Sequence, residues 1–576
     1  MINAELARAF DRNADLMEID GADAFRVNSY RRVARTIKNS TEDMAVVSAE
    51  GRLSELPGVG KGTAERIRQF LESRRIDVLE ELEAKFPPGL PELLEIPGFG
   101  PKKVALVYSK LDVRGMDDLK RVIESGELTA MPGLGETSVR KIAEGLRFLE
   151  SSGGRTPLGL ALPLARAFAE RIAGLPGVKQ VELAGSLRRG AETIGDIDIL
   201  CEAADGEAII KAFVAFGEVK RVLASGTTKG SITVQLGKSR EVQIDLRVVA
   251  GESFGAALQY FTGSKEHNVR LRERALARKL RLNEYGLFDG DKPIAGKKEA
   301  DIYRNLDLPF IPPELREDRG ELDGKKAPLL VTLEDIRGDL HMHTTASDGK
   351  CSIEEMAVSA RNLGYEYIAI CDHSKSSVIA NGLSVERMKE HIKTIRAAAK
   401  STPGITVLVG CECDILPDGT MDYPDEILAE CDWVVASIHS AMGSSESDKL
   451  SPTQRTIAAM ENRFVSAIGH PTGRLINKRA AMELDMAAVM QGAVRTQTIL
   501  EVNANWMRLD LKDHYVRQAL EQGATLVIDT DAHHTEQLHQ MQFGVTTARR
   551  GGATKGDVVN CLTLSALCKR IAAKRG

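Results

Sequence analysis

The stretch GDIDIL, Gly195 to Leu200, decides how the middle of this 576-residue chain is interpreted. Its isoleucines alternate with aspartates, a pattern that predicts a short β-strand. Residues two apart in a strand face the same side, so Asp196 and Asp198 would lie side by side. Two carboxylates at that spacing repel each other unless a cation lies between them. The stretch therefore predicts a metal site on an otherwise apolar strand.

Two neighbouring segments extend this site. AGSLRRG (184–190) supplies a tight turn, a hydroxyl and two guanidinium groups, which suits a triphosphate. EVQIDLRVV (241–249) is a second alternating strand that places Asp245 and Arg247 on one face. Three carboxylates from two strands can hold two Mg²⁺ or Mn²⁺ ions about 4 Å apart, the arrangement used for nucleotidyl transfer.

Together with YFTGSKEHNVRLR (260–272) and LNEYGLF (282–288), these motifs resemble the family X DNA polymerases, the DNA polymerase beta family. The resemblance covers residues 1 to about 317. It implies a bacterial-type repair polymerase that fills short gaps, with gapped or primed DNA and dNTPs as its partners.

The resemblance also implies residue roles. Asp196 and Asp198 would bind both metal ions, and Asp245 would bind the catalytic ion and help to activate the primer 3′-hydroxyl. Arg272 would contact the template strand. Two positions depart from the family, because Gln243 replaces an arginine that orients the catalytic aspartate and Lys265 replaces an acid. The implied nucleotide contacts are Arg155, Gly185, Ser186, Arg189, Gly195, Tyr260, Phe261, Gly263 and Asn268, with the Gly263–Ser264 turn in an unusual backbone geometry.

The first 150 residues are helical in pattern and repeat one phrase: LPGVGKGTAERI (56–67), IPGFGPKKVALV (96–107) and MPGLGETSVRKI (131–142). This helix–hairpin–helix pattern allows a tight turn whose backbone N–H groups can bind a phosphate, although a single copy could simply join two helices. Three copies, and the basic stretch 25–38 with Tyr30, favour contact with the DNA backbone. The glycines concerned are Gly58, Gly60, Gly98, Gly100, Gly133 and Gly135.

Members of this family can also excise a 5′-deoxyribose phosphate through a Schiff-base lysine in this module. Arg66 stands at that lysine's position here, and Lys61 lies on the turn. An arginine stays protonated and cannot act as the amine nucleophile. The sequence therefore argues against a strong lyase of the usual kind.

The second half has different chemistry, since ten of the eleven histidines follow residue 340. Short apolar runs each end in a metal-competent residue and precede a helix, which predicts a (βα)7 barrel with its site at the strands' C-terminal ends. The nitrogen and oxygen ligands could hold up to three Mn²⁺ or Zn²⁺ ions. These ligands are His341, His343, Asp348, His373, Glu412, His439, His470, Asp531 and His533.

This half resembles the polymerase and histidinol phosphatase (PHP) domain over about residues 337–576. The resemblance implies a 3′→5′ exonuclease that also removes blocking 3′ groups. It assigns one metal to His341, His343, Glu412 and Asp531, a second to Glu412, His439 and His470, and a third to Asp348, His373 and His533. Lys375 and Arg474 are candidates for the substrate phosphate, and Cys413 is expected to pack within a strand. Surface or core positions are expected for His267, His391, His514, His534 and His539.

Composition limits the remaining questions. The formal charge of −5 gives no support to nucleic-acid binding outside local patches. Eight scattered cysteines, no apolar run of membrane length and no signal pattern predict a cytoplasmic protein without a membrane partner. A monomer is the default expectation, and the DNA substrate implied by the resemblance places the protein at the nucleoid.

The expected fold is multidomain, α+β and α/β. Its segments are a helix–hairpin–helix domain (1–85), fingers (86–152), the nucleotidyltransferase palm (153–250), the thumb (251–317), a linker (318–336) and the PHP domain (337–576). Three alternatives stay open. The chain could be a non-templated nucleotidyltransferase, and its C-terminal half could be a small-molecule phosphatase or an inactive scaffold.

Overall fold

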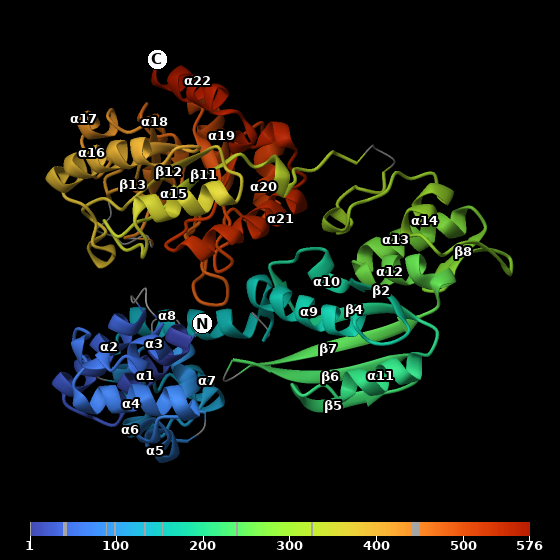
Figure 1. Cartoon of the computed structure of the whole chain (residues 1–576), viewed down its shortest axis with the longest axis horizontal. Helices are drawn as coiled ribbons and strands as arrows, with labels where there is room; N and C mark the ends of the chain where they lie inside the picture. Colours follow the sequence, from blue (N-terminus) through green and yellow to red (C-terminus); the bar gives the residue numbers. More distant parts are fainter. Residues whose placement is uncertain are drawn as a thin grey trace. The chain divides into compact units, whose positions relative to one another are not determined.

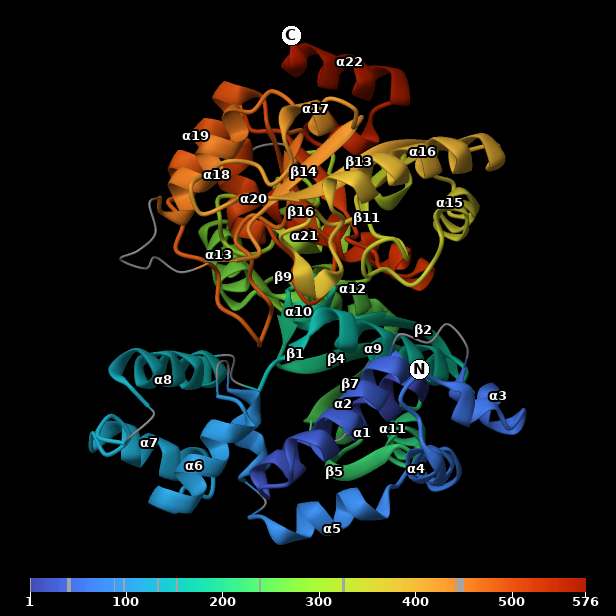
Figure 2. The ribbon, with the colours of Figure 1, turned by 90° about the vertical axis from the view of Figure 1, so that its left-hand side faces the viewer.

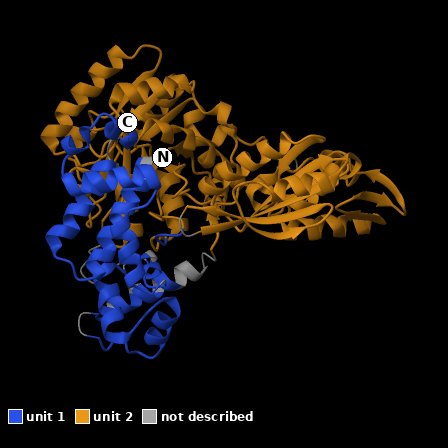
Figure 3. Cartoon of the chain, turned by 60° about the horizontal axis from the view of Figure 1, so that its bottom comes forward, with its two compact units in different colours: residues 1–153, 477–480 blue, residues 154–476, 481–576 orange. Residues whose placement is uncertain are grey.

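The computed structural model describes residues 2–38, 43–87, 89–96, 99–131, 134–151, 154–237, 240–323, 327–440, 442 and 450–576 (Figure 1). The chain forms two compact units, residues 1–153 with 477–480 and residues 154–476 with 481–576 (Figure 3). No helix among the described residues is long and apolar enough to cross a lipid bilayer.

The first unit is helical. Gly60 and Gly100 are the extended N-cap residues of α4 and α6, and Gly135 immediately precedes α8, so the repeated phrase begins a helix each time. Gly58 has a φ of 82°, a backbone conformation that a residue with a side chain would adopt only under strain. The helices are α1 (Ile2–Ile19), α2 (Ala24–Lys38), α3 (Met44–Ala49), α4 (Lys61–Ser73), α5 (Asp77–Lys85), α6 (Pro101–Leu111), α7 (Met116–Glu124) and α8 (Glu136–Ser151).

The second unit begins with a five-stranded sheet in the order β2-β4-β7-β6-β5, in which only β4 and β7 are parallel. Phe168 of α9 and Phe213 of α11 touch edge to face, so both helices cover the same face of this sheet. The elements are β1 (Thr156–Pro157), α9 (Leu158–Ala173), β2 (Val178–Leu183), α10 (Gly185–Arg188), β3 (Thr193–Ile194), β4 (Asp196–Ala203), α11 (Gly206–Val214), β5 (Val219–Ser225), β6 (Lys229–Leu236) and β7 (Arg240–Val249).

A small subdomain with its own core follows this sheet. Buried Leu271, Ile302 and Tyr303 hold it together, and the fully buried Arg316 pairs with Glu299 beneath it. Its elements are α12 (Phe254–Thr262), α13 (Lys265–Ala277), β8 (Leu280–Asn283), β9 (Gly286–Asp289), β10 (Lys292–Ala295) and α14 (Glu299–Asn305).

The rest of the chain forms the predicted (βα)7 barrel, a parallel sheet in the order β11 to β17 with helices around it (Figure 2). The barrel nearly closes, because Met342 pairs with Ala532 beyond the last strand. The strands are β11 (Gly338–Met342), β12 (Tyr367–Ile370), β13 (Thr406–Asp414), β14 (Trp433–Ser437), β15 (Ala467–Ile468), β16 (Ile499–Asn503) and β17 (Leu526–Asp529). The helices are α15 (Ile353–Asn362), α16 (Val385–Ser401), α17 (Asp425–Leu428), α18 (Pro452–Glu461), α19 (Met486–Thr496), α20 (Asp513–Glu521), α21 (Met541–Gly551) and α22 (Leu564–Arg575).

The five-stranded sheet and the barrel share one apolar core. Ile476, Leu509 and Phe543 of the barrel lie in the same buried cluster as the side chains of α9 and β4. Gly159 of α9 is also in tight contact with the barrel, since a Cβ there would lie 2.3 Å from the Trp506 ring. The two domains are therefore packed as one body rather than tethered.

Phe543→Ala should lower the free energy of unfolding by about 3–5 kcal/mol, because it removes an aromatic side chain from this core and leaves a cavity. Tryptophan fluorescence during urea unfolding measures the loss. Val494→Ala, on an exposed barrel helix, is the control and should cost less than about 1 kcal/mol. Equal losses for the two variants would contradict the shared core.

Candidate active sites

The three predicted aspartates lie together on the parallel strands β4 and β7. Asp198 is the register partner of Asp245, and Asp196 is the partner of Gln243. Burial, and then the carboxylates of Asp196 and Asp245, raise the pKa of Asp198 to about 7. A divalent cation beside this carboxyl group would stabilise its ionised form. The charge arrangement therefore fits bound metal ions.

Asp245 is held by three neighbours. Ser231 donates to Asp245 Oδ1 at 2.5 Å, Gln243 donates to the same atom at 2.9 Å, and Lys229 Nζ lies 3.0 Å from Oδ2. Burial raises the pKa of Asp245, but these donors outweigh it and leave the pKa lowered. Gln243, where the family has arginine, thus still orients the aspartate. Sequence reasoning missed Lys229, whose position opposite β7 only the strand register reveals.

The Gly-Ser turn lies directly against these carboxylates. Gly185 has a φ of 62°, and a Cβ on it would lie 2.2 Å from Asp198 Oδ2. Ala184 N donates to the Asp198 carbonyl at 2.8 Å, which fixes the turn to β4. The turn therefore brings the helix α10, which contains Ser186, to the edge of the carboxylate cluster.

The two arginines of this turn have different surroundings. Arg188 makes a double hydrogen bond to Glu299 at 2.9 Å for each bond. Arg189, predicted to contact the triphosphate, pairs with Glu317 at 3.0 Å and donates to the Thr262 carbonyl at 2.6 Å. Its guanidinium is mostly buried and points toward the thumb, so a triphosphate would have to compete with Glu317.

An ionic chain continues from this turn into the barrel. Arg550 of α21 lies 3.0 Å from Glu317 and donates to the Arg189 carbonyl at 2.6 Å. Its other nitrogen lies 3.0 Å from Asp513, which also pairs with Arg319 at 3.2 Å. The barrel thus supports the backbone of the nucleotide turn through buried charges.

The other predicted nucleotide contacts border the same region. Arg155 donates to the Thr193 carbonyl at 2.7 Å and lies against Gly195. The rings of Tyr260 and Phe261 meet edge to face at 5.1 Å. Asn268 donates to the Tyr260 carbonyl at 2.7 Å, the Gly263–Ser264 peptide is cis, and Arg272 is exposed.

The predicted DNA contacts of the helical unit are described in part. Gly58, Gly60, Gly100 and Gly135 are exposed, whereas Gly98 and Gly133 lie outside the described residues. Tyr30 is only 7% exposed, because its ring packs on Phe10 and lies under the Arg66 guanidinium. Most of this tyrosine thus belongs to the core, and only its edge remains for DNA.

The nine predicted barrel ligands converge at the C-terminal ends of the strands. Glu412 is central, with carboxylate oxygens 2.9 Å from His373 Nδ1, 2.9 Å from His470 Nε2 and 3.3 Å from His439 Nε2. His341 and His343 lie 3.5 and 3.6 Å from it. Three overlapping groups can hold an ion: His343, Asp348, His373 and His533; His341, His343 and Glu412; and His373, Glu412 and His439.

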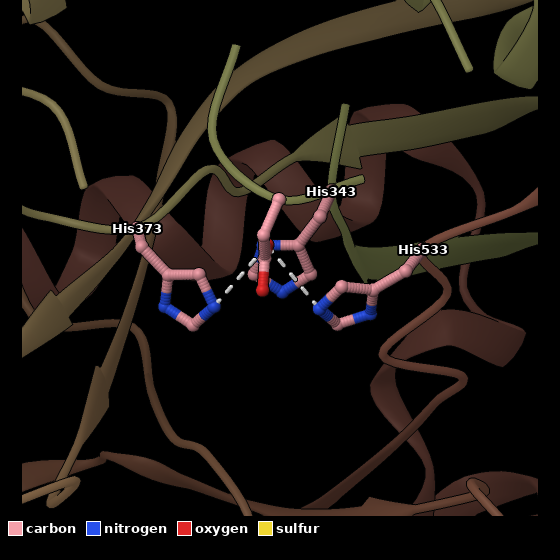
Figure 4. A group of neighbouring side chains, drawn as sticks. His343, His373 and His533 are labelled. Atoms are coloured by element: carbon pink, nitrogen blue, oxygen red, sulfur yellow. Dashed lines mark ion pairs between the residues drawn. The ribbon is translucent and has the colours of Figure 1, made fainter. Parts of the chain in front are cut away.

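These groups differ slightly from the expected ligand sets. His343 belongs with Asp348, His373 and His533 as well as with Glu412, and Figure 4 shows the three imidazoles turned toward one another. His373 Nε2 and His533 Nε2 lie 3.6 and 3.4 Å from Asp348. Asp531 and His470 belong to none of the three groups, although Asp531 lies 3.1 Å from His343 and His470 lies 2.9 Å from Glu412.

Buried atoms without hydrogen-bond partners mark the barrel site as a metal site. They are His341 Nε2, His343 Nδ1, His373 Nδ1 and Glu412 Oε2, of which the last two lie 2.9 Å apart without the geometry of a hydrogen bond. Unpaired buried polar atoms are rare and costly, and metal coordination would satisfy these four. Burial alone would raise the pKa of Glu412, but the surrounding imidazoles hold it well below its usual value. The donor set is nitrogen and oxygen throughout, which fits Mn²⁺ or Zn²⁺.

A second layer of acids orients these ligands. Glu501 accepts a bond from His341 Nδ1 at 2.6 Å and also binds the His470 backbone, and Asp414 lies 2.6 Å from His439 Nδ1. Sequence reasoning assigned no ligand to the strand of Glu501. Its signal was an acid in the middle of an apolar strand, which is costly unless it has a partner.

The candidate phosphate contacts have different outcomes. Arg474 pairs with Glu192 of the palm at 2.8 Å and is mostly buried, so a substrate phosphate would have to compete with Glu192, and the predicted contact stays a prediction. Lys375 is half exposed and remains available near Asp422. Arg508, not predicted, lies 3.4 Å from Asp531 at the site itself.

The residues expected to be structural fit that role. His267 is buried against Glu321 and Tyr303, and His391 is buried against Asp372. Cys413 is buried and accepts a bond from the Tyr423 amide.

Comparisons with known proteins place this architecture. Family models match for a helix-hairpin-helix domain (residues 1–76), a SAM-like helix-hairpin-helix tandem (90–147), the DNA polymerase beta thumb (257–317) and the PHP domain (339–504). The chain is 38% identical over 567 residues, 98% of both chains, to the DNA polymerase/3'-5' exonuclease PolX of Bacillus subtilis (strain 168).

Two further relatives each match one half of the chain. DNA polymerase lambda of Rattus norvegicus is 26% identical over 322 residues, 51% of this chain and 53% of its own. A protein of Thermoanaerobacter sp. (strain X514) named a probable phosphatase is 25% identical over 230 residues, 38% of this chain and 89% of its own. The fold and both carboxylate sites define a nucleotidyltransferase joined to a PHP metallo-domain. The chain belongs to the bacterial family X DNA polymerases with a C-terminal PHP domain.

Gly185→Ala should reduce primer extension about 100-fold, since the new Cβ must displace the Asp198 carboxylate by about an ångström. Shortening of the primer should be unchanged. Gly177→Ala is the matched control, because Gly177 also has a positive φ but no atom within 4 Å of the added Cβ. An active Gly185 variant would mean that the turn does not limit the position of Asp198.

Glu501→Gln should weaken metal binding in the barrel about 10- to 100-fold, because His341 loses the carboxylate that orients it. The Mn²⁺ concentration for half-maximal primer shortening measures this, and extension should not change. The exposed Glu430→Gln is the control. An unshifted Mn²⁺ dependence would show that His341 is oriented without Glu501.

Proposed function

We propose that this chain fills short gaps in DNA during repair and cleans 3′ ends before extending them. It is a DNA polymerase with a 3′→5′ exonuclease, acting on DNA and nucleotides with divalent metal ions. The observation that carries both activities is the presence of two separate carboxylate-rich sites, one on β4 and β7 and one on the barrel.

In the palm, Asp196, Asp198 and Asp245 are proposed to hold two Mg²⁺ or Mn²⁺ ions. When bound, such ions activate the attacking 3′-oxygen and stabilise the leaving phosphates. Ser231, Gln243 and Lys229 hold Asp245 in place, and Asp245 would help to activate the primer 3′-hydroxyl. The remaining nucleotide contacts proposed from the sequence surround this point, with Ser186 at the triphosphate and Asn268 at the base.

In the barrel, the nine ligands are proposed to hold up to three Mn²⁺ or Zn²⁺ ions. When bound, these ions lower the pKa of water and polarise the phosphoester. Glu412 belongs to two of the three ligand groups, Glu501 and Asp414 orient His341 and His439, and Arg508 would contact the scissile phosphate from beside Asp531. DNA substrates with blocked 3′ ends would be processed by the same chemistry, which would hydrolyse the phosphoester and leave a free 3′ end.

The remaining details are proposals that rest on the motifs. The exposed hairpin glycines and Arg272 would contact the DNA backbone. The six-segment division of the chain is likewise a proposal, supported by four matched regions that each fall inside one of its segments. The protein would act as a monomer beside nucleoid DNA in the cytoplasm, where gapped substrate arises.

A second function has one specific observation in its favour. The barrel half is similar to proteins named probable phosphatases, so it could hydrolyse small phosphate esters instead of DNA ends. The retention of all nine ligands argues against an inactive scaffold. The match to the polymerase thumb argues against a non-templated nucleotidyltransferase.

The primary experiment uses a 5′-labelled primer on a short-gapped template with Mn²⁺, with and without dNTPs. Asp198→Asn should abolish extension and spare shortening, while Glu412→Gln should do the reverse. Each substitution removes one negative charge and keeps the shape of the side chain. Changing the template base should change the nucleotide incorporated.

Parallel assays separate the alternatives. Shortening that survives in Glu412→Gln would exclude the barrel as the nuclease. Hydrolysis of free phosphate esters without shortening of DNA would favour the phosphatase, and incorporation independent of the template base would favour the non-templated enzyme.

A further inference from the structure

An exposed apolar pair stands on the loop that follows the ligand His373. Four large apolar side chains in the described part of the chain are more than three-quarters exposed: Phe25 (85%), Leu329 (90%), Val378 (79%) and Ile379 (106%). Only Val378 and Ile379 are adjacent. Single exposed apolar residues are ordinary, but a pair at a functional site indicates a binding surface.

The loop that carries this pair is fixed to the metal centre on one side. Ser377, next to Val378, lies 3.1 Å from the Asp414 carboxylate and 3.4 Å from Nδ1 of the ligand His439. Ser376 donates to Asp422 through its hydroxyl at 2.6 Å and its amide at 2.8 Å. The apolar pair is thus one residue away from a contact with a metal-binding histidine.

The same loop is fixed on its other side. Asn381 donates to the Ser347 carbonyl at 3.1 Å, beside the ligand Asp348. Gly382 closes the loop on itself, because a Cβ there would lie 1.9 Å from the Ser374 carbonyl oxygen. The Leu383 amide donates to the His373 carbonyl at 2.8 Å. These contacts on both sides fix the backbone of the loop, so Val378 and Ile379 stay exposed to solvent and do not pack against the barrel.

We propose that Val378 and Ile379 form a wedge that inserts at the 3′ end of DNA and unstacks its terminal base pair before cleavage. The proposal rests on the exonuclease proposed for the barrel. Aliphatic side chains separate stacked bases in many DNA-binding proteins. A paired 3′ end must be opened before its last phosphodiester can reach the buried ligands. Lys375, half exposed on the same loop, supplies a charge for the DNA backbone.

The wedge predicts a dependence on base pairing. In a Val378→Ser/Ile379→Ser double variant, shortening of a primer with a paired 3′ end should fall about tenfold, because opening a base step costs a few kcal/mol. Shortening of a primer with unpaired 3′ nucleotides should fall less than about threefold. Hydrolysis of the p-nitrophenyl ester of thymidine 5′-monophosphate and the Mn²⁺ content should not change.

Two matched variants control this test. Leu329→Ser removes an equally exposed apolar side chain outside the loop and should leave every rate unchanged. The exchange Val378→Ile/Ile379→Val keeps the apolar pair and should retain activity on paired ends.

Two results would overturn the wedge. One is an unchanged rate of the double variant on paired ends. The other is an equal loss on all three substrates, which would mean that the loop only supports the metal centre. Failure of the proposed exonuclease looks different, because the wild type itself would then leave DNA intact while still hydrolysing the ester.

Discussion

Buried groups whose charges or polar atoms are left uncompensated without a metal ion are the constraint on which both halves of this protein depend. Burial, and then the neighbouring Asp196 and Asp245, raise the pKa of Asp198 to about 7, and Glu412 lies at the centre of a buried group of imidazoles with unpaired atoms. Both arrangements destabilise the fold when no metal ion is bound. In both, parallel strands deliver the acids to one edge, and turns with unusual backbone geometry, such as Gly185, bring the remaining groups to contact distance.

Much of this could be predicted from the sequence, because the determining features are local. Alternation in GDIDIL identified a strand with two acids on one face, and apolar runs ending in histidine identified the barrel and its ligands. These patterns depend only on the period of a strand and on the rule that parallel strands end together. The glycine of each described hairpin could be placed before its helix because the repeated Pro-Gly phrase is also a local signal.

What could not be predicted depends on the packing of distant segments. Lys229 reaches Asp245 only through the strand register, and Glu501 reaches His341 across the barrel from 160 residues away. Arg474 was expected at the substrate because of its place after a ligand, but it pairs with Glu192 of another domain. Tyr30 is predicted to contact DNA, and the sequence did not show that most of its ring also packs in the core. A linear pattern does not show which partner such side chains meet.

The shared core of palm and barrel has an evolutionary consequence. Phe543 and Leu509 complete the palm's interior, and Arg550 supports the backbone of the nucleotide turn, so the barrel is part of the polymerase's own scaffold. A gene truncated before the barrel would expose apolar surface and remove Arg550, one of the two arginines that pair with Glu317. A lineage that no longer needs the nuclease can therefore discard its chemistry by single substitutions at the ligands, yet must continue to inherit the whole domain.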